Sequence, residues 1–447
     1  MNLNNLARRL ESNYNTLKEE NRSGEMDIIE DLEWRGAINQ QTDSIGLKKL
    51  LESKTITLYC GVDPTGDSMH IGHLIPFMIL KRFQLAGHQP IVVIGGATGS
   101  IGDPSGRTSE RTLQTMEIVE KNARKLTAQM KRLFLEEDAS ENSFKILNNY
   151  DWLSSFSLLD FLRDYGKHFN INTMLAKDVV SSRLETGISF TEFAYQILQS
   201  VDFHHLFQEF GVQLQVGGAD QWGNITAGLD FIRRMEGPEA EAYGLTIPLM
   251  LKSDGTKFGK SAGGSTIWLD SDKTTPYEFY QFWLNQADSD VVKYLKYFTF
   301  LTQEEIAELE NEISEAPHLR NAQKRLAEEI TRFVHGEDAL QDALLITKAL
   351  FTGNVQELTL KQIEAGFQNM PQVNYEAKEE NIVIWLVETG IVKSRREARE
   401  FVSNGAILLN GEKITDLEYT VKPSDAIGSK YIIVRRGKKN YTLVICS

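Results

Sequence analysis

The sequence contains little cysteine: its 447 residues hold two, Cys60 and Cys446. Two cysteines cannot build a disulfide framework or a thiolate metal site, and they suit a reducing compartment. No apolar run approaches the roughly 18 residues that a membrane-spanning helix needs. Residues 1–25 carry acidic side chains and lack the apolar stretch of a secretory signal. Together these absences predict a cytoplasmic protein.

Charge is unevenly distributed along the chain. The whole sequence has a formal net charge of −14, which argues against nonspecific nucleic-acid binding by the molecule as a whole. Residues 381–447, by contrast, hold 11 Lys and Arg against 7 Asp and Glu. A basic carboxyl-terminal segment on an acidic body predicts an anionic partner for that segment.

The length and the apolar pattern predict several domains, because a chain of 447 residues is too long for one core. Short β-rich runs alternate with helical segments, which predicts an α/β fold with a doubly wound parallel sheet. Strands are expected at 55–62, 89–96, 143–150, 212–218 and 244–251, with a helix over 70–87. The predicted parts are an N-terminal extension at 1–25, an α/β domain at 26–274, a helical domain at 275–350, a linker at 351–380 and a small basic domain at 381–447.

The carboxyl-terminal third has its own signals. The polar segment 366–381 has no apolar period, which favours a linker. After it, a helix is expected to end at Asn404-Gly405, and two strands are expected to turn at Asn410-Gly411. This pattern predicts a small α+β module.

Two histidines, His70 and His73, stand three residues apart at the start of the first predicted helix. Asp67 and Ser68 precede them and are predicted to cap that helix, while Gly72 leaves room for a ligand near the backbone. Helix N-termini and imidazole N–H groups both suit phosphate, so the stretch favours a nucleoside triphosphate site. A metal site is the weaker interpretation because no third ligand follows at a useful spacing. Two partly exposed helix histidines with no function remain an open alternative.

A second stretch, "KSDGTKFGKSAGGS" at 252–265, contains lysines beside glycines. It is not a Walker loop, because the spacing of that motif is absent. Flexible lysines in such a loop suit the neutralisation of a leaving pyrophosphate. The alternative is an ordinary solvated loop.

With both stretches in view, a family resemblance appears. His70-Ile71-Gly72-His73 matches the HIGH signature of class I aminoacyl-tRNA synthetases, and the stretch 257–261, "KFGKS", resembles their KMSKS loop. The flanking stretches "TLYCGVDPTGDSMHIGH", "GGATGSIGDPSGR", "NNYDW" and "GGADQWGNITAG" resemble bacterial tyrosyl-tRNA synthetases. The resemblance covers residues 26–447, with Phe258-Gly259 as a departure from the usual Met-Ser. It implies a Rossmann-like catalytic domain, then a helical domain, then a small α+β RNA-binding domain.

The sequence also contains a candidate pocket wall. Tyr195, Gln199 and Asp202 fall at i, i+4 and i+7 of an otherwise apolar predicted helix, which forms a polar stripe. An exposed polar face is the alternative, but the helix carries few charges. The stripe therefore favours the lining of a pocket.

The resemblance assigns roles to individual residues. It implies that Asp202 and Tyr59 hold the substrate phenol, and that Tyr195, Gln199 and Asp103 hold its ammonium group. Rejection of phenylalanine then follows from unpaired polar groups, as is known for the tyrosine-specific synthetases themselves. The residues implied to contact the phosphates of ATP are His70, His73, Thr65, Lys257, Lys260 and Ser261. The residues implied near the adenosine or adenylate are Asp63, Gly72, Asp220 and Gln221. Mg²⁺ is expected to accompany ATP, with no bound prosthetic group and no protein metal site.

The basic module resembles a small RNA-binding fold that also occurs in a ribosomal small-subunit protein. Its candidate contacts to tRNA phosphates are Arg395, Arg396, Arg399, Arg435, Arg436, Lys438 and Lys439, with a solvated basic face as the alternative. The resemblance implies a homodimer and the ligation of tyrosine to its tRNA at the expense of ATP. Three alternatives remain: a nucleotidyltransferase with a similar histidine motif, a noncatalytic RNA-binding paralogue, and a tryptophan-specific relative.

Overall fold

The computed structural model describes residues 27–447, except 107–108, 110–111, 136–139, 186, 257, 261–263 and 438–439. The N-terminal extension predicted at 1–25 lies outside the described residues. The chain divides into two compact units. The first unit contains residues up to 270 together with 286–322, and the second contains 271–285 and 323–447.

The first unit is built on a six-stranded sheet of order β1-β6-β5-β2-β3-β4. The strands are β1 (Gln40–Gln41), β2 (Thr57–Val62), β3 (Gln89–Ile94), β4 (Lys145–Asn148), β5 (Val212–Gly218) and β6 (Tyr243–Ile247). All neighbours run parallel except β1, which pairs antiparallel with β6. All five strands predicted from the sequence are therefore confirmed, within a few residues at their ends. The additional β1 is a two-residue edge strand, which is too short to show a period.

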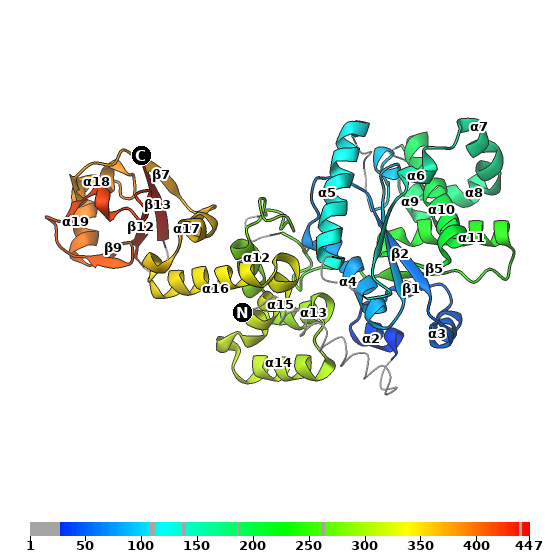
Figure 1. Ribbon diagram of the computed structural model, residues 1–447, viewed down its shortest axis with the longest axis horizontal. Helices are drawn as coiled ribbons and strands as arrows, with labels where there is room; N and C mark the ends of the chain where they lie inside the picture. Colours follow the sequence, from blue (N-terminus) through cyan, green and yellow to red (C-terminus); the bar gives the residue numbers. More distant parts are fainter. Residues whose placement is uncertain are drawn as a thin grey trace. The chain divides into compact units, whose positions relative to one another are not determined.

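Helices cover both faces of this sheet, as a doubly wound fold requires (Figure 1). One face carries α4 (Ile71–Leu85) and α5 (Met116–Phe134), and the other carries α10 (Phe190–Phe210) and α11 (Trp222–Glu236). The inner strand β3 has only buried residues after its first position, because a parallel strand between two helix layers contacts apolar side chains on both sides. The α/β prediction is thus confirmed.

The strand order reverses at β2. From β2 the chain proceeds through β3 to β4 on one side of the sheet, and then returns to place β5 and β6 on the other side. At such a switch point the connections leave in opposite directions, so a crevice forms at the carboxyl ends of the strands. Asp63 follows β2 and Ala219 follows β5, which puts predicted site segments at this crevice.

Shorter helices complete the first unit. They are α2 (Ile28–Trp34), α3 (Ser44–Ser53), α6 (Tyr150–Leu153), α7 (Leu158–Asp160), α8 (Ile171–Leu175), α9 (Asp178–Ser181), α13 (Asp288–Phe298) and α14 (Gln303–Glu315). Within the described ranges, none of the helices is both long and apolar enough to cross a membrane.

The second unit combines helices with a five-stranded sheet of order β10-β9-β12-β13-β7. Its helices are α12 (Pro276–Leu284), α15 (Asn321–His335, nearly all in this unit), α16 (Glu337–Thr352), α17 (Leu360–Phe367), α18 (Ile382–Glu388) and α19 (Arg395–Ser403). The strands of the sheet are β7 (Gln372–Tyr375), β9 (Ile407–Leu409), β10 (Glu412–Ile414), β12 (Tyr431–Arg436) and β13 (Asn440–Cys446), and β8 (Glu380–Asn381) pairs separately with β11 (Thr420–Val421). The helix predicted before Asn404 and the hairpin at Asn410-Gly411 are both confirmed.

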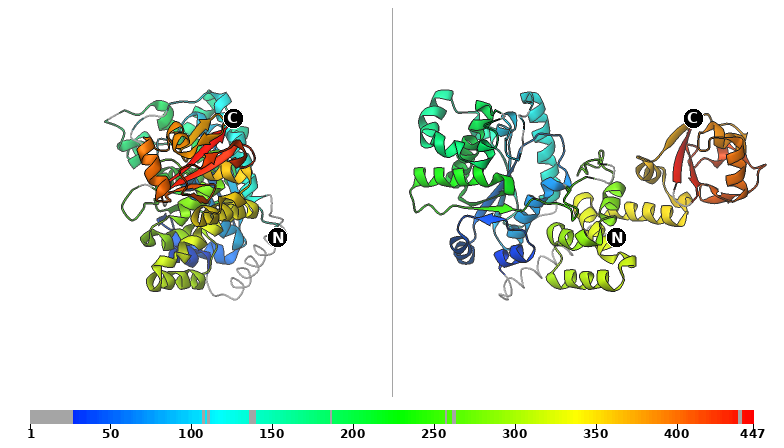
Figure 2. Two further views of the ribbon diagram at one scale, coloured as in Figure 1. Left: turned by 90° about the vertical axis from the view of Figure 1, so that its left-hand side faces the viewer. Right: turned by 180° about the vertical axis from the view of Figure 1, so that it is seen from behind.

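Alternating side chains of β12 divide this sheet between two cores. Ile432 and Val434 pack with α18 and α19, whereas Tyr431 and Ile433 pack with α16 and α17. Figure 2 shows these strands with the orange helices on one side and α17 on the other. Successive residues of a strand point to opposite faces, so β12 serves both cores at once.

The predicted linker at 351–380 is wrong in its central part. Ile363 and Phe367 of α17 are fully buried, and β7 pairs parallel with the end of β13. The segment looked polar because β7 is an edge strand whose side chains alternate between exposed and half-buried. The helical stretch after residue 275 is also divided, since α13 and α14 belong to the first unit.

Candidate active site

The histidine pair lies where β2 leads into α4. His70 is the N-cap residue of α4, and its Nδ1 accepts a hydrogen bond from the backbone N–H of Gly72 at 3.1 Å. His73 Nδ1 in turn accepts from the N–H of His70 at 3.4 Å, and the two rings stack with centroids 3.8 Å apart. The prediction that Asp67 and Ser68 cap this helix is therefore wrong. Asp67 pairs with Lys125 of α5 instead, and the Ser68 hydroxyl donates to the Met69 carbonyl.

These contacts determine which ring nitrogens can donate. Because Nδ1 of each neutral imidazole is an acceptor, the ring proton lies on Nε2. Burial lowers the pKa of His70, which favours the neutral ring. Each histidine thus presents an Nε2–H donor from the start of a helix.

The absence of a side chain at Gly72 leaves room for the His70 ring. A Cβ at this position would lie 2.9 Å from Cε1 of His70. The missing side chain is therefore required first by the His70 ring, which occupies the space above the backbone.

The lysine stretch is joined to the histidine segment by backbone pairing. The Ile71 N–H donates to the Ile267 carbonyl at 3.1 Å, and the Leu269 N–H donates to the Met69 carbonyl at 2.9 Å. Lys260 forms an isolated bridge with Thr266 just before this pairing. The structure therefore brings Lys260 to the histidine side of the sheet, while Lys257 and Ser261 lie outside the described residues.

Phe258, the departure from the family pattern, contacts the helical part of the first unit. Its ring lies 4.9 Å from that of Tyr294 and 5.4 Å from that of Phe298, both on α13. The Ser253 N–H also donates to Asp290 of α13 at 2.9 Å. An aromatic side chain at 258 thus fills a site between two other aromatic rings.

Asp202 of α10 is the deepest charged group of the crevice. The Trp152 indole Nε1–H donates to Oδ1 at 2.7 Å, and Asn149 Nδ2 donates to Oδ2 at 2.8 Å. Burial raises the pKa of Asp202 to about 7, although both hydrogen bonds act in the opposite direction. The sequence interpretation did not assign a role to Asn149 or Trp152. Their signal was present, since "NNYDW" is one of the stretches that carry the resemblance.

Two buried polar atoms lie on the neighbouring strands without a partner. Among the described residues, neither the Tyr59 hydroxyl nor Oε1 of Gln215 has a hydrogen-bond partner. Tyr59 is 2% exposed and Gln215 is 4% exposed, and they are paired in register between β2 and β5. Burial and the nearby Asp202 raise the pKa of Tyr59, so its hydroxyl keeps its proton. Unsatisfied buried groups cost free energy and are typical of places that a ligand fills. Gln215 was also not predicted, although a glutamine inside a buried strand is an unusual choice.

A second group of polar side chains surrounds Asp103. Gln221 Nε2 donates to Asp103 Oδ2 at 2.7 Å, and the Ser105 N–H donates to Oδ1 at 2.9 Å. Asn224 of α11 donates to Gln199 at 3.0 Å, and Gln199 contacts Gln221 at 3.3 Å. The structure thus brings together Asp103, Gln199 and Gln221. Asn224 of the stretch "GGADQWGN" was not assigned a role.

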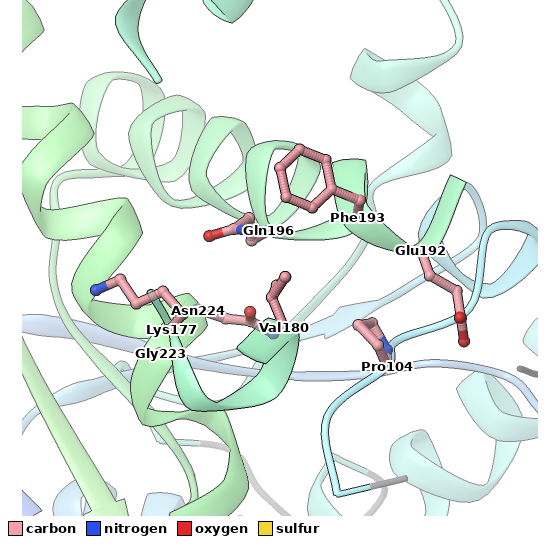
Figure 3. Close-up of a pocket in the computed structure, with 8 residues that line it drawn as sticks. All are labelled: Pro104, Lys177, Val180, Glu192, Phe193, Gln196, Gly223 and Asn224. Atoms are coloured by element: carbon pink, nitrogen blue, oxygen red, sulfur yellow. The ribbon is translucent and has the colours of Figure 1, made fainter. Parts of the chain in front are cut away.

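A small cavity adjoins this group (Figure 3). Asn224, Gln196 and Phe193 line it, with Gln196 and Phe193 both projecting from α10. Its lining does not include the stripe residues Tyr195, Gln199 and Asp202.

Asp63, immediately after β2, links Thr98, in the segment after β3, to Tyr195 of α10. Its Oδ1 accepts from the Thr98 hydroxyl and its Oδ2 from the Tyr195 hydroxyl, both at 2.7 Å. A Cβ at Gly95 would collide with this carboxylate at 1.9 Å, so glycine is required at the end of β3. Tyr195, predicted near an ammonium group, is therefore bonded to the carboxylate predicted near the adenylate.

Two further predicted residues lie at the rim. Asp220 lies after β5, where burial and the charge of Asp103 raise its pKa. Thr65 lies in the loop before His70, and Gln114 donates to its carbonyl at 3.1 Å. Both residues lie in segments that border the crevice: Thr65 in the loop after β2, and Asp220 after β5.

The candidate RNA-binding arginines do not form one surface. Arg395, Arg396 and Arg399 are exposed on α19. Arg435 and Arg436, in contrast, are half-buried on opposite faces of β12: Arg435 lies over Tyr441, and Arg436 donates to the Ile391 carbonyl. Lys438 and Lys439 lie outside the described residues. Among the described side chains, the exposed members of the predicted cluster are therefore those of α19.

Comparison with known proteins identifies the family of the chain. Residues 51–352 match the model of the family described as tRNA synthetases class I (W and Y). Residues 362–444 match the tyrosine–tRNA ligase SYY-like C-terminal domain. The two matches together cover both units.

Full-length relatives narrow the assignment. The chain is 64% identical to tyrosine–tRNA ligase 2 of Bacillus thuringiensis subsp. konkukian over 420 residues, which is 94% of this chain and 99% of the relative. It is also 64% identical to the tyrosine–tRNA ligase of Limosilactobacillus reuteri over 418 residues, with the same coverage. A C-terminally truncated mitochondrial tyrosyl-tRNA synthetase from Aspergillus nidulans superposes with a TM-score of 0.67 at 32% identity, covering 77% of this chain and 99% of that one. The chain therefore belongs to the tyrosine–tRNA ligases of the class I tRNA synthetase family.

Proposed function

We propose that this ATP-dependent tyrosine–tRNA ligase activates tyrosine at the carboxyl ends of β2, β3 and β5. The observation that carries the proposal is the buried Tyr59 hydroxyl, which has no partner among the described residues and is electrostatically coupled to Asp202. A substrate phenol can accept from Tyr59 and donate to Asp202, and it satisfies both groups. Gln215 lies on the strand beside Tyr59 and would contact the same end of the substrate.

The other end of tyrosine is assigned to the group around Asp103. The Asp103 carboxylate would pair with the substrate ammonium, and the side chains of Tyr195 and Gln199 would form hydrogen bonds beside it. Asn224 supports this arrangement because it holds Gln199 at 3.0 Å. The substrate carboxylate then faces Asp63 and the histidine helix.

The chemical step is an attack by the substrate carboxylate on the α-phosphorus of ATP, which gives tyrosyl-adenylate and pyrophosphate. His70 and His73 donate Nε2–H groups to phosphate oxygens, and the lysine stretch neutralises the leaving pyrophosphate. In this assignment Thr65, Lys257, Lys260 and Ser261 contact the phosphates. Asp63, Gly72, Asp220 and Gln221 contact the adenosine or adenylate, with Asp220 suited to accept from ribose hydroxyls. Mg²⁺ enters with ATP as substrate, and the 3′-terminal hydroxyl of tRNA later attacks the adenylate carbonyl.

The first prediction concerns the pH dependence of tyrosine binding, and it follows from the raised pKa of Asp202. Tyrosine binding requires the ionised carboxylate as acceptor, and in the free enzyme this group titrates near its raised pKa of about 7. Tyrosine affinity should therefore increase as the pH rises from about 6 to about 8, by up to about tenfold per unit below the pKa. Isothermal titration of tyrosine and of phenylalanine, which has no hydroxyl, measures the effect. A pH-independent tyrosine affinity, or an identical profile for phenylalanine, would contradict this role of Asp202.

The second prediction separates the chemistry of His70 from its structural role. His70→Asn keeps an N-cap residue of the preferred kind but removes the Nε2–H donor. The rate of adenylate formation should fall about 100-fold or more, while tyrosine affinity changes little. Stopped-flow activation with tyrosine titration measures both quantities. Weakened tyrosine binding at an unchanged activation rate would mean that His70 contributes to substrate binding and not to the chemical step.

We also propose that α19 contacts tRNA phosphates. Support comes from three exposed arginines on one short helix of an otherwise acidic chain. Simultaneous charge reversal of Arg395, Arg396 and Arg399 to Glu should weaken tRNA binding and reduce its salt dependence, because fewer counterions are released. ATP–pyrophosphate exchange should be unchanged. The matched control is simultaneous charge reversal of Lys324, Lys348 and Lys361, three exposed cations on α15, α16 and α17 of the same unit. Equal effects of the two triple variants would mean a general charge effect with no special role for α19.

Finally, we propose that the enzyme is a homodimer. The segment between β4 and β5 exposes many apolar side chains, including Leu158 (70%), Leu159 (75%), Leu184 (50%) and Phe190 (71%). A patch of this kind is typical of a protein interface, and an identical patch on a second copy is an apolar partner for it. The cytoplasmic location stays a prediction.

Leu159→Asp tests the interface. A buried aspartate would oppose association, so sedimentation equilibrium should show a lighter species than the parent at equal concentration. Leu249→Asp is the control, because Leu249 is similarly exposed at 69% but lies outside this segment. A dimer that survives Leu159→Asp, or a parent that is monomeric, would reject the assignment.

A further inference from the structure

The loop that carries the phosphate-binding groups is held by a helix that contributes no assigned ligand. Residues 64–69 connect β2 to His70, and α5 lies against them through a row of polar side chains. Asn122 Nδ2 donates to the Pro64 carbonyl at 3.1 Å, and Gln129 Oε1 accepts from the Met69 N–H at 2.9 Å. Asn122 and Gln129 are seven residues apart, so they lie on the same face of α5.

Gln129 makes the contact nearest to the chemistry. Its Nε2 donates to the Ser68 hydroxyl at 2.8 Å, and that hydroxyl donates to the Met69 carbonyl at 2.9 Å. Ser68 is 3% exposed and Met69 is fully buried. Without the glutamine amide, the Met69 N–H would be a buried donor one residue before His70, and the loop would have to move to satisfy it.

The same helix reaches the other signature segment. Arg132 of α5 donates to the Leu269 carbonyl at 3.3 Å, and the Leu269 N–H donates to the Met69 carbonyl at 2.9 Å. Met69 is therefore hydrogen-bonded through its N–H to Gln129 and through its carbonyl to Leu269, which follows the lysine stretch. Lys125 and Asp67 form a partly exposed ion pair in the same row, but such pairs contribute little.

We propose that Gln129 is a positioning residue for tyrosine activation: through Ser68 and Met69 it fixes His70 relative to the lysine stretch. The inference rests on the role proposed above for His70. Gln129 touches no reacting atom in this scheme. Its effect arises because a displacement of about 1 Å in a phosphate-binding group can cost about 100-fold in rate.

The test is a double-mutant cycle on the full-length enzyme. Gln129→Met keeps the length and the helix propensity but removes both hydrogen bonds, and it should reduce the rate of adenylate formation about 10- to 100-fold. Tyrosine affinity should stay within about twofold, because Tyr59 and Asp202 are held by other elements. Arg124→Met is the matched control: Arg124 lies on the exposed face of α5 and forms an ion pair with Glu120 of the same helix, so its removal should leave the rate unchanged.

The cycle with His70→Asn distinguishes positioning from a general structural role. If Gln129 acts through His70, the rate losses are non-additive, and Gln129→Met costs little in the His70→Asn background. Fully additive losses, or an unchanged rate in Gln129→Met alone, would overturn the inference. Gln129→Glu retains the acceptor for the Met69 N–H and should lose less than Gln129→Met; if Gln129→Met fails to fold, the same cycle is run with Gln129→Glu.

The outcomes also separate this inference from the proposed site. If His70→Asn has no effect on adenylate formation, the role of His70 itself is wrong. If His70→Asn is impaired while Gln129→Met is normal, only the positioning role fails. Thermal unfolding of each variant, followed by circular dichroism, shows that the assay temperature lies below the transition.

Discussion

One chain of hydrogen bonds, buried at Asp202 and partly buried at Asp63, connects Asp202 to Tyr195 across the crevice. The side-chain amide of Asn149 donates to both Asp202 and the Thr98 hydroxyl, and the Thr98 hydroxyl donates to Asp63. Asp63 also accepts from Tyr195. The chain begins on α10 and passes through residues that follow β4, β3 and β2, so the positions of three strands and one helix are fixed by polar contacts as well as by apolar packing. In a low-dielectric interior such a network specifies one arrangement, because any displacement leaves a buried group unpaired.

This network is maintained at a cost in stability. Burial raises the pKa of Asp202 from 3.8 to about 7, so between these values the folded protein binds more protons than the unfolded chain. The contribution of Asp202 to stability is therefore greatest at low pH and is lost as the pH rises through about 7, by an amount on the order of a few kcal/mol. The Tyr59 hydroxyl, which has no partner in the part of the chain that the structure describes, adds a further cost. In the proposed site, a substrate phenol would accept from Tyr59 and donate to Asp202, which would offset both costs.

The sequence predicted the strands and the fold class more accurately than it predicted the hydrogen-bond partners of individual side chains. Apolar runs and turn residues located five strands and the α/β class, because a buried parallel strand is almost continuously apolar. The polar stripe Tyr195, Gln199 and Asp202 was visible because polar groups are rare on a helix that is otherwise apolar. The N-cap of α4 was mispredicted, since Asp67 and Ser68 have the preferred chemistry but are engaged by α5, a helix some fifty residues later. The linker was mispredicted because an edge strand and a short helix show too few apolar residues to reveal a core supplied by β12 and β13.

The same limitation applies to charge. Arg435 and Arg436 are adjacent in sequence, and adjacency suggested one basic surface. Adjacent strand residues point to opposite faces, so one guanidinium lies over Tyr441 and the other bonds to the Ile391 carbonyl and lies over Phe401. In α19 the spacing is helical, and Arg395 and Arg399 fall one turn apart on the exposed side. Whether neighbouring cations form a surface therefore depends on the period of the element that carries them, and that period has to be established before charge density is interpreted.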